Sequence, residues 1–408
     1  MSSRIHNPDL PGSPILPGAT IGMVGGGQLG RLFALEARRM GYHTIILDPD
    51  SSAPAGQVAD DQIRAPLADI SAARELAARA DVVTLEWENA DVGAISALEE
   101  LIPVRPGAGV LRVAQNRILE KTEARRLGLS TADFRAVSSQ AELVDAVRDL
   151  GTPSILKTAT GGYDGKGQAV IRSPGDAATA FAELGGGVVP LILEAFVDFR
   201  MEVSVLCARG PDGRVESFPV VENRHQNGIL DLTLAPAPLP APLAREAVKI
   251  GETLTRGLGV VGLLAVEMVV GRDDQLYVNE IAPRPHNSGH YTWEACSVSQ
   301  FEQQLRAVCG LPLARPELLR PAAMANLLGE HCGTGKGLLS VADALARPGL
   351  ALHLYGKQSA RAGRKMGHLT ALADSAEEAA TQVMEARAAI EAEYRRNPEP
   401  AAGNRGIE

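Results

Sequence analysis

A glycine-rich turn between an apolar stretch and a helical pattern constrains the fold of this chain more than any other feature. The apolar stretch ATIGMV is followed by GGGQLG at residues 25–30, and residues 29–40 then carry apolar side chains at helical spacing. HTIILD and DVVTLEWE are further strand-like segments, with the helical pattern DISAARELAARA between them. Alternation of strand and helix predicts an open parallel sheet with right-handed crossovers. We therefore expect a parallel α/β unit that ends near residue 115.

The same turn raises an alternative function. Gly25, Gly27 and Gly30 form G-x-G-x-x-G, and Asp48 follows eighteen residues beyond the last glycine. In dinucleotide-binding proteins such a turn holds a pyrophosphate at a helix N-terminus, and the acid holds a ribose. A nicotinamide-dependent oxidoreductase is therefore one hypothesis, although this motif alone is weak and requires a chain that is otherwise dehydrogenase-like.

Composition narrows the class of protein. A length of 408 residues suits about three domains. The net charge of −9 argues against a nucleic-acid binder or a membrane-surface binder. No apolar run is long enough to span a membrane, and the first 18 residues lack the apolar core of a secretory signal. The four cysteines form no C-x-x-C pair, so we expect reduced, mostly buried thiols in a cytoplasmic protein.

The strongest local signal is TGGYDGKGQ at residues 160–168, between two strand-like segments. Its four glycines leave backbone N–H groups free to surround phosphate oxygens, while Lys157 and Lys166 add positive charge. It is not a Walker loop, because no G-K-[ST] opens a helix. We interpret it as a nucleotide-phosphate loop in a small α+β lid; a flexible hairpin tip is the alternative.

Two acids stand in the strand-like segments GLLAVEMVV and LYVNEIA, which GRDDQ joins. An ionised carboxylate in a buried strand is costly unless it is paired or bound to a metal. If the segments pair as a hairpin, Glu267 and Glu280 face each other. Two oxygen donors beside a polyphosphate suit Mg²⁺. A structural ion pair plus an exposed acid remains the alternative.

Two more segments carry charge or hydrogen-bonding groups. RPHNSGHYTWE at residues 284–294 gathers Arg284, two histidines and Asn287, and we interpret it as a substrate loop. KQSARAGRKMGH carries four basic residues and suits an anion, although a solvated basic face is the usual meaning of such a run. A phosphate loop, a carboxylate pair and a separate anion site are typical of a kinase or ligase with a phosphorylated second substrate, not of a hydride-transfer enzyme.

These blocks resemble the ATP-grasp superfamily and, more narrowly, the N5-carboxyaminoimidazole ribonucleotide synthetases, from residue 20 to about residue 394. The matching stretches are GGGQLGR, TLEWENA, NRILEK, TGGYDGKGQ, ENRHQNGIL, NEIAPRPHNSGHYTWEACSVSQFE and GKQSARAGRKMGHL. The resemblance implies an α/β ATP-grasp fold with an α+β lid, in a three-domain architecture like that of biotin carboxylase. The expected segments are a flexible N-terminal extension (1–19), an N-terminal α/β pre-ATP-grasp domain (20–115), a linker helix and lid (116–199), a catalytic domain (200–394) and a flexible tail (395–408).

The resemblance also implies roles for particular residues. The residues expected at ATP are Arg117, Lys157, Gly162, Tyr163, Asp164, Gly165, Lys166, Gly167, Gln168, Glu194, Ala195, Phe196, Val197, Glu202, His225, Asn279 and Glu280. Those expected at the ribonucleotide are Gln28, Leu29, Glu86, Asn287, Lys357, Arg361, Arg364 and Lys365. Glu267 and Glu280 are expected to bind Mg²⁺, or Mn²⁺ in its place. Tyr163, Asp164, Lys166 and Arg284 are expected at the reacting groups. Many relatives have Arg where this chain has Lys166, so bidentate geometry is lost there.

The implied activity is ATP- and bicarbonate-dependent carboxylation of 5-aminoimidazole ribonucleotide through carboxyphosphate, in purine biosynthesis, with release of ADP and phosphate. Small molecules are then the partners, and the family suggests a homodimer. The nearest alternative is another ATP-grasp ligase, such as a formate-dependent glycinamide ribonucleotide formyltransferase. Biotin carboxylation is disfavoured, because the chain has no Met-Lys-Met attachment site.

Overall fold

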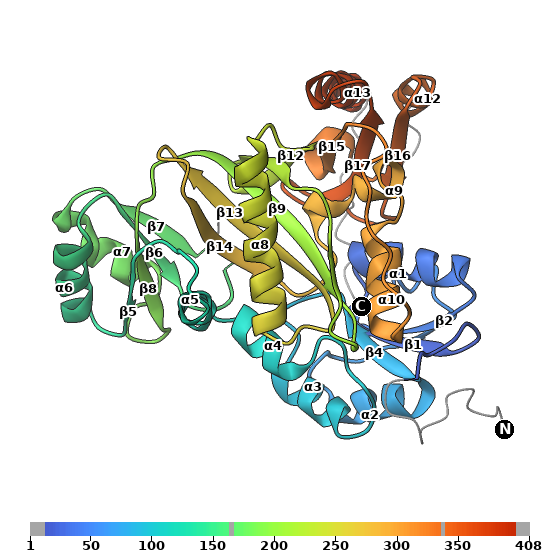
Figure 1. Cartoon of the computed structure of the whole chain (residues 1–408), viewed down its shortest axis with the longest axis horizontal. Helices are drawn as coiled ribbons and strands as arrows, with labels where there is room; N and C mark the ends of the chain where they lie inside the picture. The colour runs from blue at the N-terminus through green and yellow to red at the C-terminus, as the bar shows by residue number, and fades with distance from the viewer. Residues whose placement is uncertain (1–12, 163–166, 336–338, 397–408) are drawn as a thin grey trace, which may run out of the picture.

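The computed structural model describes residues 13–162, 167–335 and 339–396, which form three β-sheets and the helices that cover them. Figure 1 shows a small sheet at one end of the molecule, a large central sheet, and the N-terminal sheet below the large one.

The N-terminal sheet is parallel, with the strand order β3-β2-β1-β4. Its strands are β1 (Thr20–Val24), β2 (His43–Leu47), β3 (Asp61–Ile63) and β4 (Val82–Leu85). Its helices are α1 (Gln28–Arg39), α2 (Ile70–Arg79), α3 (Val92–Glu99) and α4 (Ala108–Ala114). β1 and β4 are almost continuously apolar because helices cover both faces of the sheet. The predicted parallel α/β unit is confirmed.

The small sheet is antiparallel, with the order β5-β8-β6-β7. Its elements, which follow α5 (Arg117–Arg126), are β5 (Phe134–Val137), α6 (Gln140–Leu150), β6 (Ser154–Thr158), β7 (Gln168–Ile171), the 3₁₀ turn η1 (Pro174–Asp176), α7 (Ala177–Glu183) and β8 (Leu191–Ala195). β6 and β7 pair directly, with Lys157 opposite Gln168. The predicted strand–loop–strand arrangement around the glycine-rich segment is thus confirmed.

The central sheet has the order β14-β13-β9-β11-β12-β15-β17-β16, and β10 pairs with β9 outside this path. Its strands are β9 (Phe199–Arg209), β10 (Val215–Ser217), β11 (Val221–Gln226), β12 (Ile229–Ala235), β13 (Gly262–Gly271), β14 (Leu276–Ala282), β15 (Ala322–Leu328), β16 (Leu350–Leu354) and β17 (Lys365–Leu372). The segment ESFPVVE is divided between β10 and β11. Pro219 lies in the gap and has no N–H for a ladder hydrogen bond.

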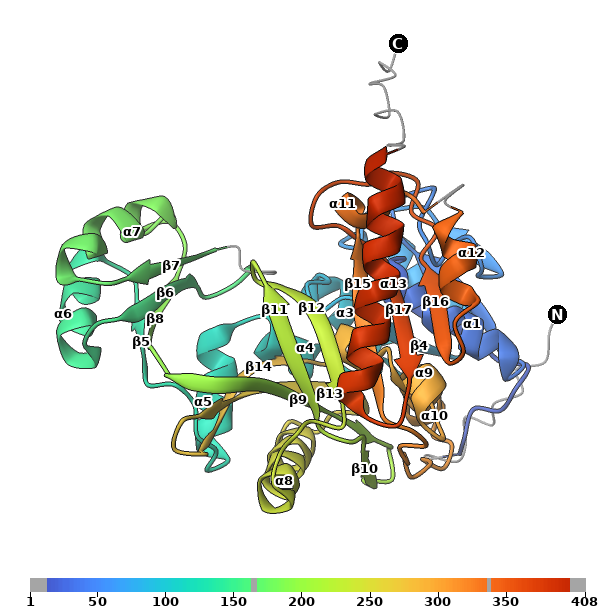
Figure 2. The ribbon, with the colours of Figure 1, turned by 90° about the horizontal axis from the view of Figure 1, so that it is seen from above.

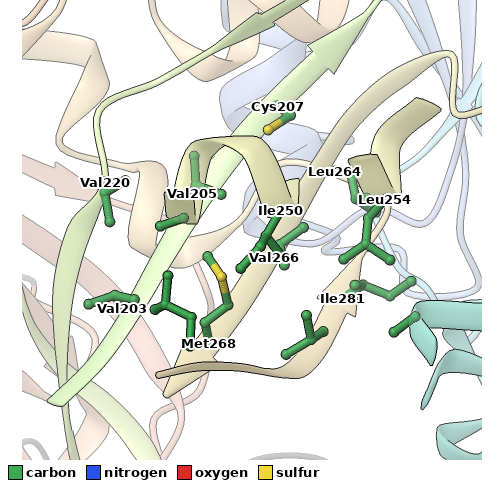
Figure 3. Close-up of a cluster of buried hydrophobic side chains, with 14 of the residues drawn as sticks. Val203, Val205, Cys207, Val220, Ile250, Leu254, Leu264, Val266, Met268 and Ile281 are labelled. Carbon is green, nitrogen blue, oxygen red and sulfur yellow. The ribbon is translucent and has the colours of Figure 1, made fainter. Parts of the chain in front are cut away.

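Helices pack on both faces of the central sheet. They are α8 (Ala241–Gly257), α9 (Thr292–Ala295), α10 (Gln300–Cys309), α11 (Gly329–Cys332), α12 (Ser340–Leu345) and α13 (Ala376–Arg396), with the 3₁₀ turn η2 (Asn287–Gly289). Figure 3 shows Ile250 and Leu254 of α8 packed on Val205 of β9 and Val266 of β13. The C-terminal helix α13 packs along β15 and β17, as Figure 2 shows.

Helix α10 joins the N-terminal sheet to the central sheet. Phe301 and Leu305 are fully buried in one core cluster with Leu32 and Phe33 of α1, while α10 also contacts β9 and β13. Elsewhere in the described chain, all four cysteines are buried and free, as predicted. No described helix is long and apolar enough to cross a membrane.

Candidate active site

A polar cleft of about 540 Å³ lies where the three sheets meet. About half of the predicted site residues line it, although they come from distant parts of the chain. These lining residues are Gln28, Leu29, Glu86, Arg117, Lys157, Gln168, Glu202, His225, Glu267, Asn279, Glu280, Arg284, Asn287 and Lys365. The carboxyl-terminal ends of β1 and β4 face this cleft, which is where open parallel sheets commonly bind ligands.

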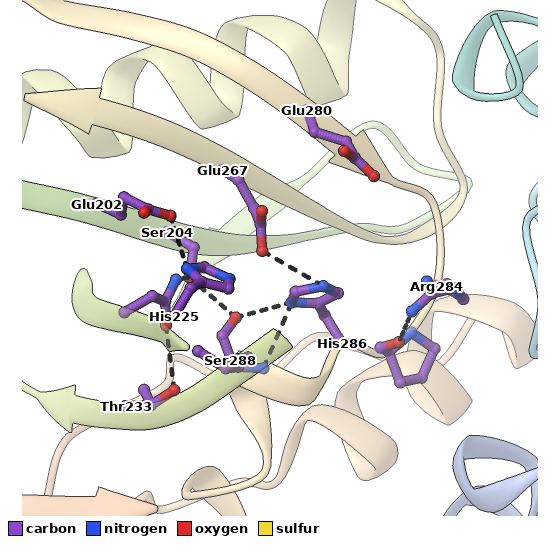
Figure 4. A network of polar contacts seen from close by, with 12 residues as sticks. Glu202, Ser204, His225, Thr233, Glu267, Glu280, Arg284, His286 and Ser288 are labelled. Atoms are coloured by element: carbon purple, nitrogen blue, oxygen red, sulfur yellow. Dashed lines mark hydrogen bonds and ion pairs between the residues drawn. The ribbon is translucent and has the colours of Figure 1, made fainter. Parts of the chain in front are cut away.

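The two predicted metal ligands are neighbours across the β13–β14 ladder, where Glu267 pairs directly with Glu280. Figure 4 shows both carboxylates on the same side of the sheet. Arg117 Nη1 lies 3.1 Å from Glu280 Oε2, and His286 Nε2 lies 3.5 Å from Glu267 Oε1. Burial and then the charge of Glu280 raise the pKa of Glu267 to about 7. The pair therefore favours a bound cation.

The donor set of this pair fits a magnesium ion that also binds substrate phosphates. No group of three or more His, Cys, Asp or Glu side chains in the described ranges is arranged to hold a metal by itself. Mg²⁺ is typically held by one or two carboxylates, with water and phosphate oxygens completing its shell. Glu267 and Glu280 supply that number of carboxylates.

Glu202 and His225 form a second polar pair in the cleft, on the adjacent strands β9 and β11. Glu202 Oε2 lies 2.6 Å from His225 Nδ1. Burial disfavours the charged imidazole, but the contact with Glu202 and the charge of Glu267 outweigh burial, so the pKa of His225 is raised. The imidazole beside a carboxylate gives this part of the cleft both a donor and an acceptor.

Lys157 lies in a buried ion-pair cluster. Its Nζ is 2.8 Å from Glu194 Oε2, and Lys121 Nζ is 3.4 Å from Glu194 Oε1. Lys121 also donates to the carbonyl of Asn279 at 3.2 Å. Burial lowers the pKa of Lys157, opposed by the charge of Glu194. Sequence reasoning missed Lys121, although the rarity of lysine in this chain and its place in NRILEK were signals.

Three residues expected at ATP lie apart from this cleft. Ala195, Phe196 and Val197 line a neighbouring cleft of about 640 Å³, together with residues that include Arg125 and Tyr277. Glu194 precedes them on β8, and its side chain is engaged by the two lysines. The structure thus brings the acids and bases of the predicted ATP site together, whereas residues 195–197 line a different cleft.

The glycine turn holds carboxylates of the chain itself. The N–H of Gly27 donates to Glu86 Oε1 at 2.6 Å, and the N–H of Gly30 donates to Glu86 Oε2 at 3.0 Å. The N–H of Gly26 donates to Asp48 Oδ2 at 2.7 Å. These are the groups that would hold a pyrophosphate in a dinucleotide-binding protein. Because Glu86 and Asp48 occupy them, the oxidoreductase hypothesis loses its phosphate site.

Arg284 is partly buried and forms an ion pair with Glu88, a residue that sequence reasoning did not select. We predicted a loop over residues 284–294. This prediction is wrong for the second half of the segment, where η2 and α9 form short helical turns. They are buried and capped internally: Thr292 Oγ1 donates to the carbonyl of Gly289 and accepts from the N–H of Gln300. His290 is therefore packed in the interior, while His286 faces the cleft.

The basic run lies at the edge of the cleft near Glu86. Lys365 lines the cleft, and Lys357 Nζ donates to the carbonyl of Lys365 at 2.6 Å. Burial, followed by the charge of Arg364, lowers the pKa of Lys357 to about 8; Glu86, Lys365 and Arg361 also act on it. Arg364 Nη1 donates to Ser359 at 2.7 Å. The four basic residues thus form one cationic cluster.

The predicted phosphate loop is only partly among the described residues. Tyr163, Asp164, Gly165 and Lys166 lie outside the described residues. The flanking glycines are described: the carbonyl of Gly162 accepts from Arg117 Nη2 at 3.3 Å, and Gly167 has a φ of 73°. The ends of the loop are thus attached beside Arg117 and Lys157.

Comparison with known proteins defines the class first. Residues 122–301 match the ATP-grasp domain, residues 18–115 the ribonucleotide synthetase preATP-grasp domain, and residues 322–382 the phosphoribosylaminoimidazole carboxylase C-terminal domain. The fold and the cleft are therefore those of an ATP-grasp ligase, as expected.

Full-length relatives then define the particular family. The chain is 44% identical over 356 residues to the N5-carboxyaminoimidazole ribonucleotide synthase of Bacillus subtilis, which covers 87% of this chain and 92% of that protein. It is 42% identical over 372 residues to the same enzyme of Pseudomonas aeruginosa, with 91% and 99% covered. An N5-carboxyaminoimidazole ribonucleotide synthetase solved as its ADP complex superposes with a TM-score of 0.87, at 45% identity, over 93% of this chain and 99% of that one. The chain belongs to the N5-carboxyaminoimidazole ribonucleotide synthase family.

Proposed function

We propose that this protein carboxylates 5-aminoimidazole ribonucleotide with ATP and bicarbonate, forming N5-carboxyaminoimidazole ribonucleotide, ADP and phosphate in purine biosynthesis. The observation that carries the proposal is one cleft with a carboxylate pair, Glu267 and Glu280, and a cationic cluster around Lys357 at its edge. A relative from Aspergillus clavatus, 32% identical, was solved with ADP and 5-aminoimidazole ribonucleotide, and supports this pair of ligands.

At the nucleotide end, Arg117 and Lys157 are suited to contact ATP phosphates, because both are cations in the wall of the cleft. Glu202 is suited to accept hydrogen bonds from ribose hydroxyls, with His225 beside it. When ATP enters, Lys157 can exchange part of its contact with Glu194 for a phosphate oxygen. Lys121 then retains the buried Glu194 carboxylate as an ion pair, which limits the cost of that exchange.

Glu267 and Glu280 would hold Mg²⁺, with Asn279 beside them. The metal ion would neutralise charge on the phosphates during phosphoryl transfer. Arg117, which contacts Glu280, lies where it can orient the same phosphates. His286 contacts Glu267 through Nε2, and burial lowers its pKa well below its usual value, so the ring is neutral.

At the ribonucleotide end, the cationic cluster is suited to the 5′-phosphate. Lys357 and Arg364 are the proposed phosphate ligands, with Lys365 and Arg361 adding positive charge. Glu86, Gln28 and Leu29 form the wall of the cleft nearest to this cluster. A phosphate there leaves the aminoimidazole ring to extend toward Arg284 and the carboxylate pair.

The proposed reaction consists of a phosphoryl transfer followed by a carboxyl transfer. An oxygen of bicarbonate attacks the γ-phosphorus of ATP, the bond to the β-phosphate oxygen breaks, and ADP leaves with carboxyphosphate formed. The exocyclic amine attacks the carboxyl carbon, or CO₂ released from it, so that phosphate leaves and the amine loses one proton. Asp164, in the segment of the lid outside the described residues, is proposed to orient that amine or accept its proton. Exclusion of water protects the labile intermediate.

Oxygen-18-labelled bicarbonate tests this route directly. Because the attacking oxygen stays on phosphorus, the phosphate released in the presence of 5-aminoimidazole ribonucleotide should carry one oxygen-18 atom. Release of unlabelled phosphate would mean that water, not bicarbonate, attacks ATP, and would overturn the proposed chemistry.

The domain boundaries at residues 115/116 and 199/200 and the homodimer remain predictions. Each has a simple test: limited proteolysis should cut near these boundaries, and light scattering should give twice the mass of one chain.

A further inference from the structure

Three histidine rings form a stack behind the cationic cluster, two of them buried and the third, His353, with a side chain 20% exposed. His368 on β17 lies between His290, which follows η2, and His353 on β16, with ring centroids 4.5 Å apart on each side. The interplanar angles are 22° and 13°, so the three rings are nearly parallel. His290 and His368 are each 1% exposed. Such a set of polar rings is unusual in a core that apolar side chains would fill.

The middle ring of the stack contacts the segment that carries the proposed phosphate ligand. Tyr355 follows β16, is fully buried, and shares a hydrogen bond of 2.8 Å between its hydroxyl and His368 Nδ1. The Nζ of Lys357 lies 5.7 Å from the centroid of the Tyr355 ring, within the range of a cation–π contact. Tyr355 is therefore held at its hydroxyl by the stack and presents its ring to the ammonium group.

The His290 end of the stack leads to the carboxylate pair. Gln300 Nε2 lies 3.1 Å from His290 Nδ1 and also donates to the carbonyl of His286 at 2.8 Å. Gln300 Oε1 accepts from the N–H of His286 at 2.8 Å. His286 in turn contacts Glu267. One continuous set of buried contacts thus connects the residue beside the metal ligands to the residue beneath Lys357.

We propose that Tyr355 is a positioning residue for Lys357, fixed by the stack of His290, His353 and His368. This inference rests on the proposed function, because it assumes that Lys357 holds the ribonucleotide phosphate. The stack fixes where the ammonium group lies relative to the carboxylate pair, so that the phosphate and the amine of one substrate meet both ends of the cleft. Tyr355 itself is not proposed to touch the substrate.

Steady-state kinetics of Tyr355→Phe test the inference, with ADP release as the readout. The phenyl ring stays beneath Lys357, but the hydrogen bond that fixes it is lost. We expect the KM for 5-aminoimidazole ribonucleotide to rise about fivefold, the effect of one ordinary hydrogen bond, with kcat and the KM for ATP unchanged. His368→Leu removes the other partner of this bond and should produce the same split, which His368→Asn, with a polar atom near Nδ1, should partly restore.

A double-mutant cycle separates this role from general support of the fold. In a Lys357→Ala background, Tyr355→Phe should add nothing to the ribonucleotide KM, because the group that it positions is gone. The same factor in both backgrounds, or an equal rise in the KM for ATP, would overturn the inference. Tyr42→Phe is the matched control, since it removes another buried hydroxyl, which donates to the carbonyl of Ile15.

The response of the wild-type enzyme to the ribonucleotide distinguishes a failure of this inference from a failure of the proposed function. If wild-type protein releases ADP in response to 5-aminoimidazole ribonucleotide and Tyr355→Phe leaves its KM unchanged, only the positioning role is overturned. If the wild-type protein does not respond to that ribonucleotide, the proposed function fails, and the inference is overturned with it.

Discussion

The carboxylate of Glu86 accepts a hydrogen bond from the backbone N–H of Gly27 at 2.6 Å, inside the turn that begins α1. A turn with the spacing of a pyrophosphate site is thereby filled by the chain itself. The positive end of the α1 dipole stabilises an acid there, in place of a nucleotide phosphate. The proposed ATP ligands therefore come from the lid and the central sheet, not from this turn.

Gly27→Ala tests how tightly Glu86 fills this turn. Gly27 has an ordinary φ of −75°, so alanine is not strained there, but its Cβ would lie 2.6 Å from Glu86 Oε1. We expect the free energy of unfolding to fall by about 1–3 kcal/mol, as for other overpacked sites. Urea unfolding measures this change.

Gly109→Ala is the control for that substitution. Nothing lies within 4 Å of a Cβ at Gly109 on α4, so alanine should raise stability by up to about 1 kcal/mol through helix propensity. Equal effects of the two substitutions would contradict the close fit of Glu86.

Glu280→Gln should abolish turnover while the fold survives. The change keeps the shape of the side chain but removes one of two proposed magnesium ligands and the ionic partner of Arg117. We expect kcat to fall on the order of 100-fold or more, because charge stabilisation at the phosphates is lost. Thermal unfolding should change little, since the Glu280 side chain is 42% exposed. Glu246→Gln, an exposed acid on α8, should behave like wild type. An active, magnesium-dependent Glu280→Gln variant would remove this residue from the metal site.

The pH dependence of ribonucleotide use should report Lys357. Its pKa is lowered to about 8, chiefly by burial, so the ammonium is charged below that pH and neutral above it. A neutral amine no longer attracts phosphate, and kcat/KM for the ribonucleotide should fall as the pH rises through about 8. Lys357→Arg keeps its charge over this range and should shift the falling limb to higher pH. If kcat/KM falls over the same pH range in the wild-type protein and in Lys357→Arg, the titrating group is not Lys357.

Arg364→Ala should chiefly raise the KM for the ribonucleotide. Loss of one charge-assisted hydrogen bond typically corresponds to about 10- to 100-fold in affinity. The KM for ATP should not change, because Arg364 does not line the cleft that the proposed ATP ligands share. Arg245→Ala, an exposed arginine on α8, is the control. A defect confined to ATP would contradict the assignment of Arg364 to the phosphate.

The sequence was sufficient for contacts that short connections determine. Glu267 and Glu280 are opposite each other because a short hairpin connection joins their strands, and Lys157 is opposite Gln168 because β6 and β7 are consecutive strands that pair. Glu86 could not be placed in the glycine turn, since 59 residues separate it from Gly27 and only the order of the parallel strands brings them together.

Buried polar networks were the other limit of sequence analysis. Lys121 and Glu88 were missed, because a lysine or a glutamate in a short motif is usually a surface residue, and its partner is set by tertiary packing. His290 looked like part of a substrate loop, yet its ring stacks in the interior on His368. His290 follows the proposed magnesium ligands closely in the sequence, but this did not place its ring beside them in the fold.

The most direct test of the central claim is the substrate dependence of ADP release. Purified protein with ATP and magnesium should form ADP when bicarbonate and 5-aminoimidazole ribonucleotide are both present, and neither alone should suffice. ADP formed only with formate and glycinamide ribonucleotide would contradict the account and assign the protein to the formylating ATP-grasp ligases.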